Sequence, residues 1–233
     1  MNTKLFWIVV CLLAFAACSK SKDSAPPCNI ITVNSTGDDP TTFTYNKDGK
    51  PVSINYGTYK TEFTYSGNTI NILQTNNGVF RTRWIVEVNS KGLAEKIRNE
   101  HNAAGTDWTD MLHTYNGDQL QKIATVNKSG VVTRISSFTW EDGNPVLISY
   151  NNGDPAIRYE YYKDKPFDPK VFLVEGNYWD VARPKNLLKN MYYGDDLNWQ
   201  KTYEFDSKGR VIAQTEKTGS SPTTYLYTYD CDR

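Results

Sequence analysis

The chain has 233 residues, and its 26 basic and 26 acidic side chains give a formal net charge of zero. A nucleic-acid-binding surface normally carries a clear excess of positive charge, so we expect no nucleic-acid partner. Aromatic residues make up 13% of the chain and include 16 tyrosines. There is no apolar run long enough for a transmembrane helix, which needs about 20 residues.

Residues 1–17 have the pattern of a signal peptide. Lys4 supplies the positive charge, and the apolar run from Leu5 to Ala17 is too short to span a bilayer core. The run ends in Phe-Ala-Ala-Cys, which resembles the lipobox of bacterial lipoproteins. In that family the cysteine is acylated, so the resemblance implies a lipid on Cys18. The alternative is a plain secretory signal with an incidental cysteine.

Residues 18–27 are polar, end in two prolines and contain no large apolar side chain, which is typical of a flexible tether. Ser19 follows Cys18, without the aspartate that retains some lipoproteins at the inner membrane. We therefore expect an outer-membrane lipoprotein of the cell envelope, held to the membrane by its N-terminal lipid. The sequence leaves open whether it faces the periplasm or the cell surface.

Two cysteines, Cys28 and Cys231, bound the single domain expected over residues 28–233. An exported chain folds in an oxidising compartment, so these two most simply form a disulfide; two free thiols are the alternative. A bond would place their Cα atoms within about 7 Å of each other. The first expected strand (residues 29–34) would then lie near the last (residues 223–230), and the sheet would be curled or closed.

A strand-turn-strand pattern recurs along this domain. In its clearest copy, Tyr203 and Phe205 share one face of a strand, and a turn with Asp206 and Gly209 leads into the next strand. Asp bonds its own backbone in such turns, and Gly supplies the left-handed position. The pattern predicts roughly 14 to 16 strands. Further copies lie at residues 43–54, 63–72, 84–92, 113–120, 126–130, 138–144 and 150–153.

The opposite face of these strands is polar and suits water. A sheet with one apolar face must bury it, and no helical pattern is available to cover it. The predicted fold is therefore all-β: a large, curved, antiparallel up-and-down meander, barrel-like or partly closed, in which a circular barrel would leave a lumen. The polar positions are Thr44, Thr64, Glu87, Thr114, Thr139, Glu160, Glu204 and Thr228.

Residues 163–200 break the pattern. Two close prolines exclude a central strand, so we expect a short helix or a long loop that acts as a plug over one open end of the core. Loops of this length are often functional. An alternative therefore makes Tyr178, Trp179 and Trp199 a stacking platform for a ligand, although packing is the commoner fate of such rings.

Candidate catalytic chemistry is absent from the sequence. Neither His101 nor His113 has a second histidine or cysteine at metal-ligand spacing, and His113 alternates in phase with Tyr115, as a core residue does. The nucleophile-elbow, phosphate-loop and dinucleotide-binding motifs are all missing. We therefore expect no catalytic residue, metal or cofactor, and a protein that is not an enzyme.

The whole mature chain resembles a family of Bacteroidetes lipoproteins of unknown function with a porin-like β fold. The lipobox, the tether, the aromatic hairpins and the Arg-Pro-Lys-Asn-Leu-Leu stretch at residues 183–188 carry the resemblance. The hairpins are also distantly similar to the YD repeats of Rhs-type shells, best at residues 205–211. We do not expect a membrane-spanning barrel, whose strands need about 9 to 11 residues with alternate apolar positions.

The sequence therefore favours a non-enzymatic, membrane-tethered binding or assembly module with another envelope protein as partner. Two alternatives stay open. One is a glycan-binding protein of the cell envelope that uses Tyr178, Trp179 and Trp199. The other is a carrier of an apolar ligand inside the curled sheet, which a fully packed interior would rule out.

Overall fold

The computed structural model describes residues 28–174, 182–219 and 221–231. The expected signal peptide (1–17), the tether (18–27) with Cys18, and the pair Tyr178 and Trp179 lie outside these described residues. The elements are β1 (Asn29–Ser35), β2 (Thr41–Tyr45), β3 (Pro51–Tyr56), β4 (Tyr59–Ser66), β5 (Thr69–Asn76), β6 (Val79–Val88), β7 (Ala94–Glu100), β8 (Trp108–Asn116), β9 (Gln119–Asn127), β10 (Val132–Glu141), β11 (Asn144–Tyr150), β12 (Ile157–Pro166), α1 (Pro169–Val174), β13 (Asn186–Tyr193), β14 (Asp196–Phe205), β15 (Val211–Thr218) and β16 (Ser221–Asp230).

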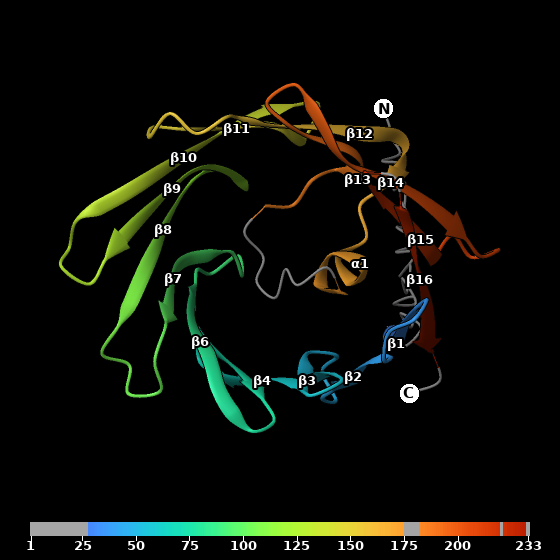
Figure 1. The fold of residues 1–233 in the computed structure, drawn as a ribbon, viewed down its shortest axis with the longest axis horizontal. Helices are drawn as coiled ribbons and strands as arrows, with labels where there is room; N and C mark the ends of the chain where they lie inside the picture. Colours follow the sequence, from blue (N-terminus) through green and yellow to red (C-terminus); the bar gives the residue numbers. More distant parts are fainter. Residues whose placement is uncertain (1–27, 175–181, 220, 232–233) are drawn as a thin grey trace, which may run out of the picture.

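The strands form one closed antiparallel barrel in chain order (Figure 1). Each strand pairs with its neighbour in sequence, and β1 closes the ring by pairing with β16 from Asn29↔Asp230 to Ser35↔Tyr225. The predicted all-β meander is confirmed, and the ring closes completely. The predicted disulfide is also present at this seam: Cys28 and Cys231 are bonded, with Cα atoms 4.0 Å apart.

Aromatic and aliphatic side chains from most of the strands point into the barrel. Positions two residues apart share a strand face, which places Phe43, Phe63 and Tyr203 in the buried interior, although Phe205 at the end of β14 is exposed. The buried residues form one cluster to which α1 contributes Val171: Ile30, Val33, Phe43, Ile54, Phe63, Ile72, Val86, Ala94, Ile97, Val171, Leu187, Tyr203, Val211 and Tyr227. The polar face predicted from the sequence is exposed at seven of its eight positions, and Glu160 is half-buried.

The outer face of the barrel carries charges at mid-strand positions. On β7 and β8, Asp110 lies 2.9 Å from Arg98 and 3.4 Å from Lys96. Barrels that span a membrane present an apolar band there and keep polar side chains in the lumen. On β7 and β8 this barrel instead has charged side chains outside, while the buried cluster inside is apolar.

A recurring bulge explains why an aromatic residue ends so many strands. In the β2–β3 hairpin, Tyr45 pairs with Pro51, and Val52 is skipped by the ladder. The Tyr65 hydroxyl on β4 then donates to the Pro51 carbonyl oxygen at 2.9 Å. Six aromatic side chains make this kind of hydrogen bond, each to the carbonyl oxygen of the residue that precedes a bulged residue on the adjacent strand. The pairs are Tyr45 to Ile30, Tyr65 to Pro51, Tyr115 to Ala94, Trp140 to Leu120, Tyr161 to Pro145 and Tyr229 to Val211.

These bonds give the repeat a physical role beyond burial. A bulge disrupts the ladder locally and bends its strand, so a carbonyl beside it needs another donor. A phenol or indole group reaches across from the adjacent strand and supplies one. The turns behave as predicted from the sequence: the Asp206 side chain accepts from the backbone N–H of Lys208 and Arg210, and Gly209 has φ 78°.

The connection between β12 and β13 enters the barrel. We call its described residues, 167–174 and 182–185, the plug segment; its helix α1 lies inside the ring of strands (Figure 1). The Lys170 ammonium of α1 bonds the Cys28 carbonyl oxygen, which ties the plug to the start of the barrel. No helix among the described residues is long and apolar enough to cross a membrane.

The expectation of an irregular stretch over residues 163–200 is wrong at both ends. Strand β12 continues to Pro166, and β13 and β14 already occupy most of residues 186–200. Proline is tolerated at a strand end, where its missing N–H breaks no ladder bond. The predicted short helix is present, and it lies within the lumen.

Candidate functional site

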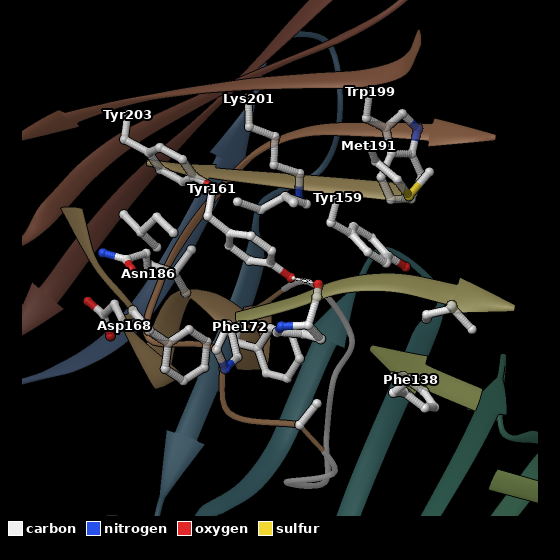
Figure 2. Close-up of a pocket in the computed structure, with 18 residues that line it drawn as sticks. Phe138, Tyr159, Tyr161, Asp168, Phe172, Asn186, Met191, Trp199, Lys201 and Tyr203 are labelled. Atoms are coloured by element: carbon white, nitrogen blue, oxygen red, sulfur yellow. Dashed lines mark hydrogen bonds between the residues drawn. The ribbon is translucent and has the colours of Figure 1, made fainter. Parts of the chain in front are cut away.

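A cavity of about 250 Å³ lies between the plug segment and the barrel wall. We call it the inner cavity (Figure 2). Its volume is close to the lower end of the range for small-molecule sites, roughly 300–1,000 Å³. The wall residues come from β10 to β14, and the rest come from the plug: Phe138, Pro145, Ile148, Tyr159, Tyr161, Phe167, Asp168, Val171, Phe172, Ala182, Pro184, Asn186, Leu187, Leu188, Met191, Trp199, Lys201 and Tyr203.

The lining of the inner cavity is mostly aromatic and aliphatic. Trp199 and Met191 lie on one side, Phe172 of α1 lies on another, and the Tyr161 ring stands between them (Figure 2). The strand period explains this, because inward positions on β12, β13 and β14 alternate with outward ones. Such walls favour an apolar molecule, which gains free energy from the surface it removes from water.

A few polar groups are placed among these walls. Lys201 is 3% exposed; its Nζ lies 3.6 Å from Glu216 Oε2 and 5.6 Å from the centre of the Trp199 ring. Asp168 accepts from the backbone N–H of Lys170 at 2.9 Å. Burial raises the pKa of Tyr159 to about 12, so its phenol stays neutral and can donate a hydrogen bond to a ligand. A small number of polar groups in an apolar site orient a bound molecule.

Tyr161 closes the inner cavity on the side of β11. Its hydroxyl donates to the Pro145 carbonyl oxygen at 3.0 Å, and burial raises the pKa of this phenol above its ordinary value. This is the β11–β12 version of the aromatic bond found around the barrel. Here the ring faces a cavity, whereas Tyr65 packs against the buried cluster.

Two buried asparagines fix the start of β13 against β11. The Asn186 backbone N–H donates to Asn144 Oδ1 at 2.9 Å, and Asn144 Nδ2 donates to Asn186 Oδ1 at 3.1 Å. Next to them, the Lys185 N–H donates to the Gly143 carbonyl oxygen at 2.9 Å. The end of the plug is therefore held by the turn between β10 and β11, and the cavity keeps its shape on that side.

The predicted ligand-binding residues are divided by the structure. Trp199 faces the lumen and lines the inner cavity, while Tyr178 and Trp179 fall outside the described residues. The glycan platform therefore stays a prediction. Sequence reasoning did not single out Tyr159, Tyr161 or Lys201, although the in-phase aromatics of β12 were a signal that could have found two of them.

The two histidines lie away from the inner cavity. His113 points into the barrel from β8, and burial lowers its pKa to about 4, which agrees with the predicted core position. His101 lies beyond the end of β7, where Nε2 is 3.2 Å from the Thr109 hydroxyl. Over the described ranges, no group of three or more His, Cys, Asp or Glu side chains is arranged to hold a metal ion.

Comparison with known proteins bears on the fold. No family model matches the chain, and no curated protein does. Solved structures do match, among them two crystal structures of porin-like proteins, each at 14% identity. The one from Bacteroides uniformis has a TM-score of 0.61 over 88% of this chain and 99% of its own. The one from Bacteroides vulgatus has a TM-score of 0.60 over 87% and 99%.

At this identity the likeness shows the fold alone, and the porin-like β fold expected from the sequence is confirmed. The comparisons do not bear on a lipid anchor, and they give no support to the resemblance to YD repeats. What the chain shares with the two Bacteroides proteins is a porin-like β-barrel.

Proposed function

We propose that this protein is a non-enzymatic binding protein that holds a small, largely apolar molecule inside its barrel. The inner cavity carries this proposal. A fully packed interior would have ruled out an apolar ligand, and instead a space of about 250 Å³ is left between plug and wall. Small-molecule sites typically combine apolar walls with a few polar groups, as Lys201, Tyr159 and Asn186 do here.

The same proposal gives a role to Trp199, one of the residues expected to bind a ligand. Its ring lies on the inner-cavity wall, close to Met191 (Figure 2). An aromatic ring at that place contributes a large apolar contact area to whatever fills the cavity. We therefore assign Trp199 to an apolar ligand within the barrel and not to a glycan on its surface.

We further propose that the protein is a lipoprotein of the outer membrane, anchored through Cys18 and the tether. The lipobox-like sequence before Cys18 supports this, and so does the disulfide, which indicates an oxidising compartment. In this arrangement the barrel is a water-exposed domain that stays close to a membrane. Replacing Cys18 (Cys18→Ala) should move the protein to the soluble fraction; a variant still found in the membrane fraction would contradict the anchor.

Ligand binding is tested first by native mass spectrometry of the full mature protein, extracted gently from the cells that make it. We expect a mass above that of the chain and its lipid, lost on denaturation. A direct test adds the apolar dye N-phenyl-1-naphthylamine and follows its fluorescence. Wild-type protein should bind it at one saturable site.

Filling the cavity should abolish this binding. Ile148 lines the inner cavity, and Ile148→Trp should weaken dye binding at least tenfold. The control is Ile212→Trp, because Ile212 is an exposed residue on β15 that does not line the cavity; it should bind dye as the wild type does. Equal dye affinity in the two variants would show that the dye does not occupy the inner cavity and would overturn the proposal.

A further inference from the structure

A second hollow, lined in part by exposed residues such as Glu141 and Lys163, adjoins the inner cavity. It measures about 620 Å³, and we call it the outer recess. Three residues, Tyr159, Tyr161 and Asn186, line both spaces. The outer recess is lined by Glu141, Asp142, Asn144, Val146, Tyr159, Glu160, Tyr161, Tyr162, Lys163, Lys185 and Asn186.

The wall between the two spaces is weakly paired, as is the β1–β2 seam, which also has two pairs. Strands β11 and β12 pair only at Leu147↔Arg158 and Ile148↔Ile157 among the described residues. Beyond these pairs, β12 runs on to Pro166 without a partner on β11. The opening is bounded at its other end by the bond between the Lys185 N–H and the Gly143 carbonyl oxygen.

Irregular registers flank this unpaired stretch on both sides. The β10–β11 ladder skips Val146, which lines the outer recess, and the β12–β13 ladder skips Lys189 between Glu160↔Asn190 and Tyr161↔Leu188. A bulge bends its strand and increases its twist, and these two lie on β11 and β13, the strands on either side of β12. The Tyr161 hydroxyl bridges the gap with a bond of 3.0 Å to Pro145.

The two spaces differ in chemistry. The inner cavity is walled by rings and aliphatic chains, whereas the outer recess has three carboxylates, two amines and an amide: Glu141, Asp142, Glu160, Lys163, Lys185 and Asn144. Groups of both signs lie together, so the recess offers donors and acceptors without a marked preference for one charge. This suits an uncharged head with several hydroxyl groups.

We infer that the two spaces form one binding site across the barrel wall, which takes an amphiphile. Its apolar part occupies the inner cavity, its hydroxyl-rich head occupies the outer recess, and it passes between β11 and β12 beside Tyr161. This inference rests on the proposed function and adds the ligand class to it. A ligand held in this way reaches its site through the side of the barrel, and not through the end filled by the plug.

A second bulge elsewhere in the barrel provides a matched control. Val52 is skipped in the β2–β3 ladder, as Val146 is in β10–β11, and it lines an outer hollow of about 600 Å³. Behind that hollow lies Phe63, which is 6% exposed and packs in the buried cluster. Hollow and bulge are therefore matched, although Val52 is exposed and Val146 is half-buried, and the residue behind Val52 belongs to the packed cluster.

The test compares Val146→Trp with Val52→Trp, using N-phenyl-1-naphthylamine as an apolar probe and octyl glucoside, below its micelle concentration, as an amphiphilic competitor. In wild type and in Val52→Trp, octyl glucoside should displace the dye, and methyl glucoside, which is a head without a tail, should not. In Val146→Trp, octyl glucoside should compete at least tenfold less well. The dye itself should keep its affinity within twofold and exchange at least fivefold more slowly.

A second variant guards against misfolding of Val146→Trp. Lys163 and Lys185 are exposed, so the double variant Lys163→Met/Lys185→Met should fold normally. It should weaken the binding of octyl glucoside at least fivefold and leave the affinity for the dye unchanged. If wild type binds no dye, the proposed function itself fails. If wild type binds dye but octyl glucoside competes equally well in every variant, the inner cavity is a site and the outer recess is not part of it.

Discussion

The hollows beside Val52 and beside Val146 are made by the same local sequence pattern and end up with different surroundings. Each follows a bulge, each is bridged by a tyrosine hydroxyl to a proline carbonyl oxygen, and their volumes are about 600 and about 620 Å³. Behind the first lies a packed core, and behind the second lies the inner cavity. The repeat therefore builds the openings, and the position of the plug decides which of them leads into a site.

The pairing of the strands also differs between the hollow beside Val52 and the hollow beside Val146. Strands β4 and β5 pair without a break from Tyr59↔Asn76 to Ser66↔Thr69, and β3 and β4 pair from Ser53↔Glu62 to Tyr56↔Tyr59. Strands β11 and β12 share two pairs, the same number as β1 and β2 at the seam near the disulfide. Regular ladders with a packed interior contribute stability, whereas the sparsely paired region next to the plug supplies an opening at a cost in stability.

The largest expected effect is a difference in unfolding free energy when isoleucine is replaced by alanine on the two sides of the barrel. Ile72 is fully buried in the core, so Ile72→Ala should lower the free energy of unfolding by about 3–4 kcal/mol. Ile148 already faces the inner cavity, so Ile148→Ala should cost only about 1–2 kcal/mol because fewer packing contacts are lost. Urea denaturation measures both values, and equal losses would show that the cavity side is as tightly packed as the core.

A smaller effect should appear on acidification, and it comes from the side away from the cavity. Burial lowers the pKa of His113 to about 4, whereas the unfolded chain titrates near 6.5. Below about pH 6.5 the unfolded state binds a proton that the folded state does not, so stability falls as the pH drops towards 4. Between pH 7 and pH 4.5 this group should contribute a loss of about 2 kcal/mol.

The variant His113→Gln isolates that contribution from the carboxylates that titrate over the same range. Its unfolding free energy should depend less steeply on pH than that of the wild type, as measured by urea denaturation at the two pH values. Parallel pH dependences in the two proteins would mean that His113 is accessible to protons in the folded state, and that the interior near β8 is open to water.

The smallest expected effect concerns the two bridging hydroxyls. Tyr65→Phe and Tyr161→Phe each remove one hydrogen bond to a proline carbonyl oxygen, and each should lower the unfolding free energy by about 1 kcal/mol. Only Tyr161→Phe should also accelerate exchange of N-phenyl-1-naphthylamine, because only that hydroxyl bridges an opening into the inner cavity. Stopped-flow fluorescence gives the rates, and faster exchange in Tyr65→Phe as well would remove the distinction between the two openings.

The sequence was informative wherever local chemistry decides the structure. Alternating aromatics and Asp or Asn turns ending in Gly predicted the strands and hairpins, because side-chain period and turn conformation are set within a few residues. The disulfide followed from Cys28 and Cys231 being the two cysteines left in an exported domain. The wet face at positions such as Thr64 and Thr139 followed from the same alternation.

Other features depended on residues far apart in the chain. The repeat did not show that Tyr161 would bridge a gap while Tyr65 seals a packed wall, since the two lie in similar local sequences. Nor did it show that β12 would run on through Pro166 while the plug segment turns inward. Those outcomes depend on where α1 packs, which is decided by contacts such as that of Lys170 with the Cys28 carbonyl oxygen.

The sequence by itself therefore determined a closed or nearly closed meander with an apolar inner face, because binary patterning and the need to bury that face leave little choice. Only the tertiary structure decided that the interior holds a cavity and that the wall opens beside it. A ring of sixteen strands encloses more space than its own side chains fill. Which part of that space the short plug fills, and which part it leaves empty, is a property of the assembled barrel and not of any one repeat.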